Sequence, residues 1–261
     1  MIPVGRLLAL MFSMVSVSAG AETIHACVDQ TDLPPFSYAQ RVDDRVTDRV
    51  VGASVDLLRK IGLAHSWTIE IQSLPWTRCL DMVAHNRLQL AINVDKTDAK
   101  ANKLQTSTSY FTLHNVYFYS RKMHPQGLTL INLADVQHYR RCGFLGYHFD
   151  LFGVDSNQVD RGMSSGYEQM IAKLHLGRCD LFIDSRETMA GQYLINPKLR
   201  SLLVNGSLVI QPLPGEPLRD LHFAVSGSTP QSNLLLKVIN TSLENLDKTK
   251  TMDDLVNSYL K

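Results

Sequence analysis

The residues best suited to chemistry lie in the stretch 90–110, where a short apolar strand is followed by polar side chains. Leu90–Ile92 is apolar, Asn93 interrupts the strand, and Thr97 and Lys100 lie in the polar turn that follows. The N–H groups at a helix start are unpaired and lie near the positive end of the helix dipole, so they attract anions. Asn93, Thr97 and Lys100 therefore predict a site for a small anion.

Aromatic and charged side chains at the ends of other predicted elements extend this site. Two prolines end the first predicted strand and present Phe36 and Tyr38 on a stiff loop. Another proline begins a helix that carries Trp76 and Arg78. Asp184 ends a predicted buried strand, which favours a position beside the ligand.

Plainer interpretations of these side chains remain open. Trp76 shares a helix face with apolar residues and suits a hydrophobic core equally well. Arg78 suits an ion pair with a nearby carboxylate, and Lys100 suits an exposed surface position. The loop that presents Phe36 favours ligand proximity over packing, because it is stiff and lies at a strand end.

The elements that position these residues form two groups. Residues 24–93 alternate as β-α-β-α-β, which predicts a parallel sheet with right-handed crossovers. Residues 41–50 are charged and predict a solvent-facing turn. A second β-α-β unit follows between residues 142 and 195, with the loop Gly146, Tyr147 and His148 after its first strand. Ligands bind beyond the carboxyl ends of such strands, so each group supplies one rim of a site.

The composition and motifs exclude several classes of protein. The chain has 26 basic and 25 acidic residues, so we expect no nucleic-acid-binding surface. Histidine spacings typical of metal sites are absent from the sequence, as are a nucleophile elbow, a Walker loop and a dinucleotide-binding glycine pattern. We therefore expect neither a metal nor a cofactor. An enzyme remains open, because scattered serines and histidines can meet in space.

The first 21 residues resemble a secretory signal peptide. Arg6 precedes an apolar run, and Ala19-Gly20-Ala21 offers a cleavage site. The alternative, a retained anchor, is less favoured because the apolar run is shorter than the roughly 20 residues that span a bilayer. We expect an exported, soluble mature chain.

Four cysteines predict two disulfides in an oxidising compartment. The favoured bridges are Cys27–Cys79 and Cys142–Cys179, since each would lie within one half of the chain. The sequence permits three pairings, and the other two remain open at this stage.

Several short motifs, taken in order, resemble bacterial periplasmic solute-binding protein family 3, the polar-amino-acid type. They are Pro34-Pro35-Phe36 followed by Gly52 and Val55-Asp56-Leu57-Leu58, then Pro75-Trp76-Thr77-Arg78, Thr97-Asp98-Ala99-Lys100-Ala101, Ser109-Tyr110-Phe111, and Leu174-His175-Leu176-Gly177-Arg178-Cys179-Asp180-Leu181. No single motif is specific, but their order and spacing cover the length of the mature chain.

The resemblance implies the type II periplasmic-binding fold, with two α/β lobes that close on a ligand. Each lobe would contain a mostly parallel sheet flanked by helices, and two crossover strands would form the hinge. The implied boundaries are residues 22–118 with 216–261 for the first lobe and 119–215 for the second.

The resemblance also implies roles for individual residues. Phe36 or Tyr38 would stack on the ligand, and Thr97 and Lys100 would hold an anionic group. Asp184 would accept from an ammonium, and the loop Gly146, Tyr147 and His148 would offer backbone donors. Lys100 stands where the family has arginine, and lysine lacks the bidentate fork that suits an α-carboxylate. This difference makes a standard amino acid a less favoured ligand.

The expected function is periplasmic binding of a small, polar, partly anionic solute by a monomer. The solute would be delivered to an inner-membrane permease or presented to a sensor receptor. The alternative is a periplasmic hydrolase or lyase on the same scaffold.

Overall fold

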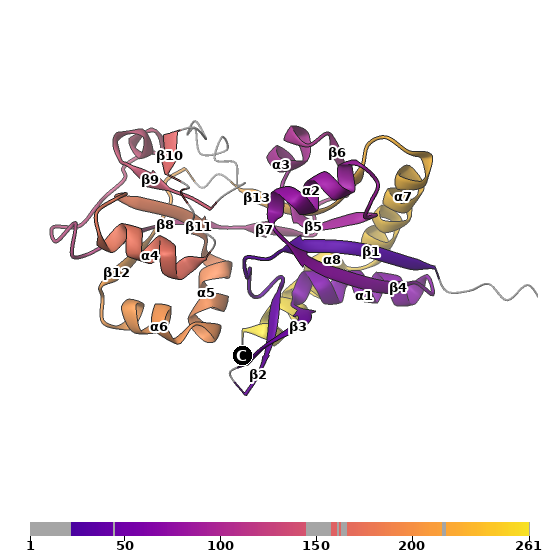
Figure 1. The fold of residues 1–261 in the computed structure, drawn as a ribbon, viewed down its shortest axis with the longest axis horizontal. Helices are drawn as coiled ribbons and strands as arrows, with labels where there is room; N and C mark the ends of the chain where they lie inside the picture. The colour runs from indigo at the N-terminus through magenta and orange to yellow at the C-terminus, as the bar shows by residue number, and fades with distance from the viewer. Residues whose placement is uncertain are drawn as a thin grey trace, which may run out of the picture.

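The computed structural model describes residues 22–43, 45–144, 158–160, 162, 166–215 and 218–260, and they form two α/β lobes that lie side by side (Figure 1). Lobe 1 contains residues 22–113 and 219–260, and lobe 2 contains residues 115–213. The predicted two-lobed α/β fold is confirmed. The proposed signal peptide lies outside the described residues.

The sheet of lobe 1 has a mixed strand order. In spatial order its strands are β4 (Thr68–Leu74), β1 (Thr23–Asp29), β5 (Leu90–Val94), β13 (Arg219–Ser226) and β6 (Leu104–Thr106), and β7 (Phe111–Leu113) pairs with the start of β13. β1 is parallel to β4 and β5, as the alternating sequence pattern predicts. β13 is antiparallel to β5, β6 and β7.

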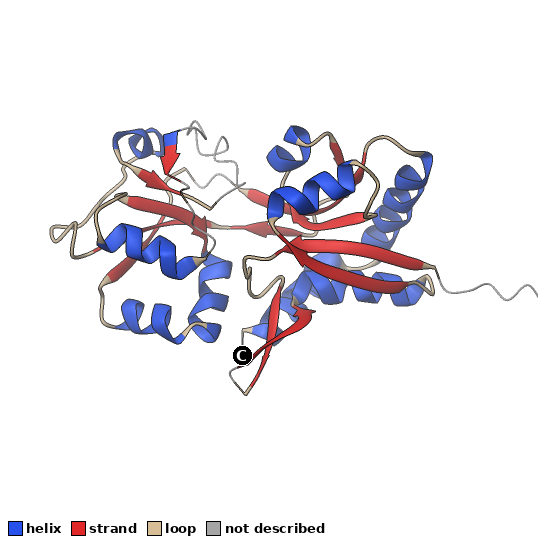
Figure 2. Cartoon of the chain, in the orientation of Figure 1, coloured by secondary structure: helices blue, strands red, loops and turns tan. Residues whose placement is uncertain are grey.

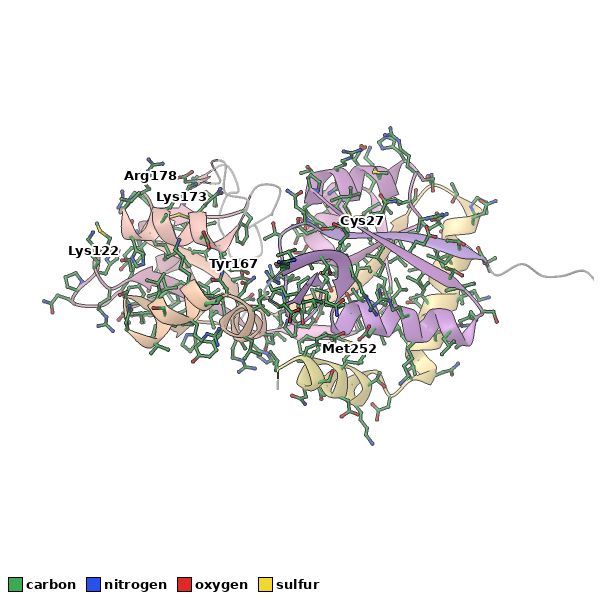
Figure 3. The ribbon with its side chains drawn as sticks, turned by 60° about the horizontal axis from the view of Figure 1, so that its bottom comes forward. Cys27, Lys122, Tyr167, Lys173, Arg178 and Met252 are labelled. Carbon is green, nitrogen blue, oxygen red and sulfur yellow. A yellow bond between two sulfur atoms is a disulfide. The ribbon has the colours of Figure 1, made fainter. Side chains whose placement is uncertain are left out.

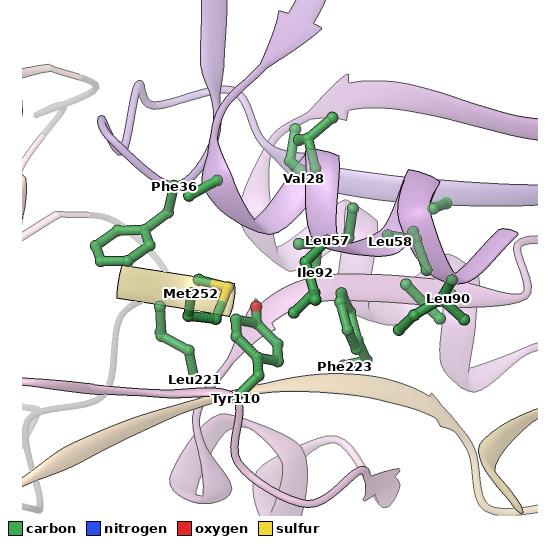
Figure 4. Close-up of a cluster of buried hydrophobic side chains, with 14 of the residues drawn as sticks. Val28, Phe36, Leu57, Leu58, Leu90, Ile92, Tyr110, Leu221, Phe223 and Met252 are labelled. Carbon is green, nitrogen blue, oxygen red and sulfur yellow. The ribbon is translucent and has the colours of Figure 1, made fainter. Parts of the chain in front are cut away.

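Helices cover both faces of this sheet (Figure 2). One face packs on α1 (Ala53–Ala64), α7 (Pro230–Asn245) and α8 (Lys248–Tyr259), and the other on α2 (Trp76–Ala84) and α3 (Lys96–Ala101). Alternate strand residues serve the two faces: Ala26 and Val28 join the first cluster (Figure 4), whereas Cys27 joins the second. The core of lobe 1 therefore has two layers.

Lobe 2 repeats this arrangement with a smaller sheet. In spatial order its strands are β10 (Val159–Asp160), β9 (Arg141–Cys142), β11 (Leu181–Ser185), β8 (Asn115–Ser120) and β12 (Leu208–Pro212). The helices α4 (Tyr167–His175), α5 (Arg186–Ile195) and α6 (Pro197–Val204) belong to one core cluster, and the 3₁₀ helix Leu133–His138 belongs to the other. Every residue of β8 and β11 is buried.

Both favoured disulfides are present. Cys27–Cys79 joins β1 to α2 with a Cα–Cα distance of 5.8 Å, and Cys142–Cys179 joins β9 to the segment before β11 at 5.7 Å. Each bridge lies within one lobe. The first holds the carboxyl end of β1 against the start of α2, where candidate site residues lie.

The strand directions refine one expectation about the sheets, and a second expectation needs correction. Both sheets are mixed, because one strand in each, β13 in lobe 1 and β8 in lobe 2, runs opposite to the other strands. The charged segment expected as a turn forms an antiparallel hairpin, β2 (Tyr38–Val42) and β3 (Arg45–Val51), which joins neither large sheet. It projects from lobe 1 beside the end of α8 (Figure 1).

The chain passes between the lobes twice, and the two crossings are neighbours. The first lies between Leu113 and Asn115, and the second between Leu213 and Arg219, where the Leu213 N–H donates to the Asn115 carbonyl at 3.1 Å. The boundary expected after residue 118 falls inside β8, which pairs along its length with lobe 2 strands. Within the described ranges, no helix is long and apolar enough to cross a membrane.

Candidate functional site

A small hollow, partly open to solvent, lies in lobe 1 where its strands end. Its walls come from the ends of β1 and β5, the loop after β1, the starts of α2 and α3, and the start of β13. The lining residues are Asp29, Leu33, Ser37, Trp76, Ile92, Asn93, Asp95, Asp98, Arg219 and Leu221. β1 and β5 are parallel neighbours, so their carboxyl ends meet at one edge, as expected for a ligand site in an α/β sheet.

Asp98 and Trp76 form a buried polar pair in this hollow. The Trp76 Nε1–H donates to Asp98 Oδ2 at 2.7 Å, and the two residues are 5% and 3% exposed, respectively. Burial, reinforced by the negative charge of Asp95, raises the pKa of Asp98 to about 8. Asp98 therefore holds a proton near neutral pH, and a nearby positive charge would favour its ionised form.

Asp95 occupies the start of α3, where the sequence predicted an anion. Its Oδ1 accepts from the Asp98 N–H at 2.8 Å, so the chain's own carboxylate caps this short helix. Asp95 and Asp98 line the hollow, whereas Lys100 is exposed on α3 and Thr97 is half-buried outside the lining set. The helix start thus contributes negative rather than positive charge to the hollow.

Asn93 fixes the edge of the hollow through its backbone and side chain. Its φ is +64°, a left-handed conformation that asparagine tolerates better than most residues. Its Oδ1 accepts from the Tyr110 hydroxyl at 2.8 Å, and its Nδ2 donates to Ser37 Oγ at 2.9 Å. Asn93 therefore joins β5 to the loop after β1 and to the segment before β7.

Arg219 and Asp184 join the lobes beside the hollow. Arg219 Nη2 lies 3.6 Å from Asp184 Oδ1, and the two side chains are 14% and 7% exposed, respectively. The Tyr167 hydroxyl donates to Asp184 Oδ2, and the Ser185 N–H donates to Oδ1 at 2.6 Å. Tyr167 lies near the junction of the lobes in Figure 3. Burial raises the pKa of Asp184, although the charge of Arg219 opposes this shift.

Helix α5 of lobe 2 touches the proline loop of lobe 1. Gln192 Nε2 donates to the Asp32 carbonyl at 2.9 Å. Gly191 faces Pro34 so closely that an added Cβ would lie 2.5 Å from the Pro34 carbonyl carbon. At the first crossing, His114 Nδ1 lies 2.7 Å from Glu187 Oε1. These contacts place the two lobes against each other beside the hollow.

The structure separates the residues expected on the first rim. Trp76 and Asn93 line the hollow, but Arg78 is exposed on α2 outside the lining set. Tyr38 packs against Tyr259 with ring centroids 6.0 Å apart, beside a different hollow. Phe36 is fully buried in the core of lobe 1, where its ring lies 5.0 Å from that of Phe111 (Figure 4).

The start of α1 explains the position of Phe36. The Ala53 N–H donates to the Pro35 carbonyl at 2.8 Å, and the Ser54 N–H donates to the Phe36 carbonyl at 3.1 Å. These bonds hold the loop on the helix, and Gly52 at φ +133° leaves room for the carbonyl of Phe36. The aromatic ring therefore turns inward instead of lining the hollow.

The remaining expectations fall at the lobe junction or outside the described residues. Asp184 lies at the junction, within the contacts given above. Gly146, Tyr147 and His148 lie outside the described residues. In the described part of the chain, no group of three or more His, Cys, Asp or Glu residues is placed to hold a metal ion.

Sequence reasoning singled out none of the four charged residues of the hollow: Asp29, Asp95, Asp98 and Arg219. Asp29 ends the first predicted strand, and Asp95 and Asp98 fall within residues 93–100, so three of the four lie in segments that the sequence placed along the rim. Arg219 stands just after a proline- and glycine-rich loop. Its alignment with β7 could not be inferred from local pattern.

The model of the family described as bacterial extracellular solute-binding proteins, family 3, matches residues 24–261. None of the curated proteins searched matches the sequence. Solved structures with the same fold include an amino acid ABC transporter substrate-binding protein, AbpA, from Streptococcus pneumoniae bound to L-arginine. It is 18% identical, the match covers 91% of this chain and 94% of that chain, and the TM-score is 0.68.

Two other structures show the range of proteins with this fold. An ancestral amino acid-binding protein, AncCDT-1, described as a precursor of cyclohexadienyl dehydratase, is 15% identical, with 92% of this chain and 96% of that chain covered and a TM-score of 0.64. A histidine kinase sensor domain with similarity to periplasmic binding proteins is 16% identical, with 92% and 96% covered, respectively, and a TM-score of 0.68. At these identities the likeness establishes the fold alone.

Proposed function

The chain belongs to the bacterial extracellular solute-binding proteins, family 3, and from that premise we propose that it binds an amino-acid-like solute with a positively charged group. The observation that carries this proposal is the clustering of Asp29, Asp95 and Asp98 around the hollow of lobe 1. The solute's ammonium or guanidinium group would lie among these carboxylates, and closure of lobe 2 would cover it.

The electrostatics of Asp98 support a cationic group. Burial and the charge of Asp95 hold a proton on Asp98, with a pKa of about 8. A bound cation would offset both effects and favour release of that proton. We therefore expect affinity for a cationic solute to rise with pH between about 6 and 8, because less work is then needed to ionise Asp98.

This proposal replaces the expectation that Lys100 captures an anion. Lys100 is exposed on α3 and is not among the residues that line the hollow. The residues facing the hollow from α3 and its cap are carboxylates instead. The L-arginine bound to the Streptococcus pneumoniae protein supports a cationic amino acid as the first ligand to test.

We further propose that the mature protein acts as a monomer in the periplasm after removal of residues 1–21. The extracellular character of the family and the two disulfides support this location. Its partner would be either an inner-membrane permease or a sensor receptor. Solved structures of both a transporter-associated protein and a sensor-kinase domain share the fold.

A thermal-shift screen followed by calorimetry tests the proposed function. At 100 times Kd, a single-site ligand should stabilise the protein by about 2.7 kcal/mol, which corresponds to a rise in Tm of roughly 5–10 °C for a chain of this size. We expect L-arginine, L-lysine or L-ornithine to give such a rise, and neutral and acidic amino acids to give little. The proposal fails if the cationic series has no effect.

Asp98 also favours a second candidate function, that of a lyase or hydrolase. A buried carboxylic acid that keeps its proton near neutral pH can serve as a general acid. The precursor relationship stated for AncCDT-1 makes this alternative relevant to the fold. Mass spectrometry of each stabilising ligand after prolonged incubation with protein distinguishes the two: an unchanged ligand supports binding alone, whereas a product lost in Asp98→Asn supports catalysis.

A further inference from the structure

We propose that Arg219 forms an anion subsite at the hinge and selects solutes that carry a carboxylate in addition to their cationic group. This inference rests on the proposed function, because it assigns the opposite end of the same solute. The ligand would then be a zwitterion, with its positive group near Asp29, Asp95 and Asp98 and its carboxylate against β13.

The position of Arg219 suits this role. It begins β13 directly after the chain returns from lobe 2, and Arg219 pairs with Leu113 of β7. Arg219 and Leu221 both line the hollow, as expected for alternate residues on one face of a strand. The guanidinium is therefore presented from the hinge, where a bound solute would contact both lobes.

The hydrogen bonding of Arg219 leaves capacity for a ligand. Its Nη2 lies 3.6 Å from Asp184 Oδ1, which is longer than a good hydrogen bond. Its Nε is buried and has no hydrogen-bond partner in the part of the chain that the structure describes. A guanidinium has five N–H donors, and a buried donor without an acceptor is unfavourable. An incoming carboxylate could satisfy two of them in the bidentate geometry that arginine favours.

Asp184 does not fully neutralise Arg219. One carboxylate oxygen accepts from the Tyr167 hydroxyl, and the other accepts from the Ser185 N–H at 2.6 Å. Burial also raises the pKa of Asp184, which weakens its preference for the charged form. Asp184 is thus a fixed neighbour that orients Arg219, and it is a poorer candidate for the solute's ammonium than the sequence indicated.

Lys100 is the rival residue for this carboxylate. It lies at the position where the family resemblance predicts the anion-binding cation, but its side chain is exposed and outside the hollow. The side chain of Arg219 is 14% exposed and lines the hollow. A charge in a desolvated site interacts more strongly with a bound anion than one in water does. Arg219 therefore explains carboxylate selection better than Lys100.

Matched ligand pairs test this inference separately from the proposed function. Calorimetry would compare L-arginine with agmatine and L-lysine with cadaverine, since each amine lacks only the carboxylate of its amino acid. For the unmodified protein we expect the amino acid of at least one pair to bind at least about tenfold more tightly, which corresponds to about 1.4 kcal/mol. In Arg219→Gln that preference should fall to within about threefold.

Two further variants separate ligand contact from a purely structural ion pair. Arg219→Gln leaves Asp184 without its cation, so Arg219→Gln/Asp184→Asn provides a version without that unpaired charge. This double variant should lose the preference for the carboxylate-bearing ligand to the same extent as Arg219→Gln. Lys100→Gln should keep the full preference. Circular dichroism confirms that each variant is folded.

The outcomes are distinct. An unchanged preference in both Arg219 variants, or its loss in Lys100→Gln, would overturn the subsite and leave cation binding intact. Equal binding of the amino acid and its amine by the unmodified protein would also overturn it. If none of the four probes binds, the proposed function fails and the subsite fails with it.

Discussion

Asp98 links the hollow to the pH dependence of stability. The unfolded carboxyl loses its proton near pH 4, whereas the folded one keeps it to about pH 8. Between these values the folded state binds one more proton, so the contribution of Asp98 to the free energy of unfolding falls as pH rises. Asp98→Asn should flatten the pH dependence between pH 5 and 8 by at most about 1.4 kcal/mol per pH unit.

Urea unfolding at pH 5, 6, 7 and 8 measures this effect in both proteins. The amide is the appropriate replacement because its oxygen can still accept from the Trp76 Nε1–H. Asp254→Asn, at an exposed position of α8, is a matched control and should leave the slope unchanged. A pH dependence of Asp98→Asn identical to that of the unmodified protein would contradict the buried, protonated state of Asp98.

Asn93 affects stability through its left-handed backbone conformation and through its side-chain hydrogen bonds. Two substitutions separate these two effects. Asn93→Ala removes the side-chain bonds to Tyr110 and Ser37 but keeps the backbone N–H bond to the Tyr110 hydroxyl, and it places alanine at φ +64°. We expect it to destabilise the protein by about 2–3 kcal/mol. Asn93→Gly loses the same bonds but tolerates the backbone, so it should be about 1 kcal/mol less destabilising. Urea unfolding measures both, and a more stable alanine variant would disprove backbone strain.

At the level of single residues, the sequence predicted strand-end positions better than chemical roles. Trp76 and Asn93 were placed on the rim and do line the hollow. Phe36 was expected there because its loop is stiff, but bonds from the start of α1 turn the ring into the core. The contribution of Arg219 depends on pairing with β7, which lies more than 100 residues away in the sequence.

Secondary-structure elements with a clear period were predicted well. β1, α1, β4, α2 and β5 all appear where the apolar pattern places them. The hairpin of β2 and β3 was missed because its strands are mostly half-buried or exposed and lack a regular apolar face. The sequence did not specify which strand of each sheet runs opposite to the others, because strand direction depends on how the chain returns between the lobes rather than on a local pattern.

The contact between α5 and the proline loop predicts the effect of a single methyl group. Gly191→Ala would place Cβ 2.5 Å from the backbone of Pro34, which has little freedom to move. The lobes should separate at this point, with about tenfold weaker binding of the identified solute and a larger radius of gyration in solution scattering. Under the proposed function the lobes close on the solute through this same contact, so separating them here should weaken binding.

Gly166→Ala provides the matched control for this change. Gly166 precedes α4 at φ −170°, and none of the described residues lies within 4 Å of an added Cβ. This variant should bind and scatter like the unmodified protein. Equal affinity and size for Gly191→Ala would show that the proline loop adapts without opening the lobes.

At the scale of the whole molecule, the two crossings leave lobe 2 as one continuous segment and divide lobe 1 into two segments. Lobe 2 is one continuous segment, with its entire sheet, its helices and its disulfide between residues 115 and 213. Lobe 1 is divided, because β13 lies between β5 and β6 and comes from the C-terminal part of the chain. The sequence predicted this division from the resemblance, but the position of β13 inside the first sheet is a structural finding.

Because lobe 2 is continuous and lobe 1 is divided, we expect the two lobes to differ in whether they fold in truncated chains. Residues 114–215 should fold alone and unfold cooperatively, since the described strands of lobe 2 pair only with one another. Residues 22–215 should contain a folded lobe 2 but an unfolded lobe 1. Without residues 216–261, the first sheet loses β13, and its core loses Leu221, Phe223 and the buried faces of α7 and α8.

Tryptophan fluorescence distinguishes the lobes, because both tryptophans of the chain, Trp67 and Trp76, belong to lobe 1. In the 22–215 chain their emission should resemble that of the protein in urea, while near-ultraviolet circular dichroism from the tyrosines of lobe 2 persists. The full chain 22–261 is the control for both signals. Native emission from the 22–215 chain would show that lobe 1 folds without β13, and a non-cooperative 114–215 segment would show that lobe 2 needs its neighbour. The expected result would show that lobe 1 depends on one strand and two helices within its last 46 residues, and the strand, β13, also carries Arg219 to the hollow.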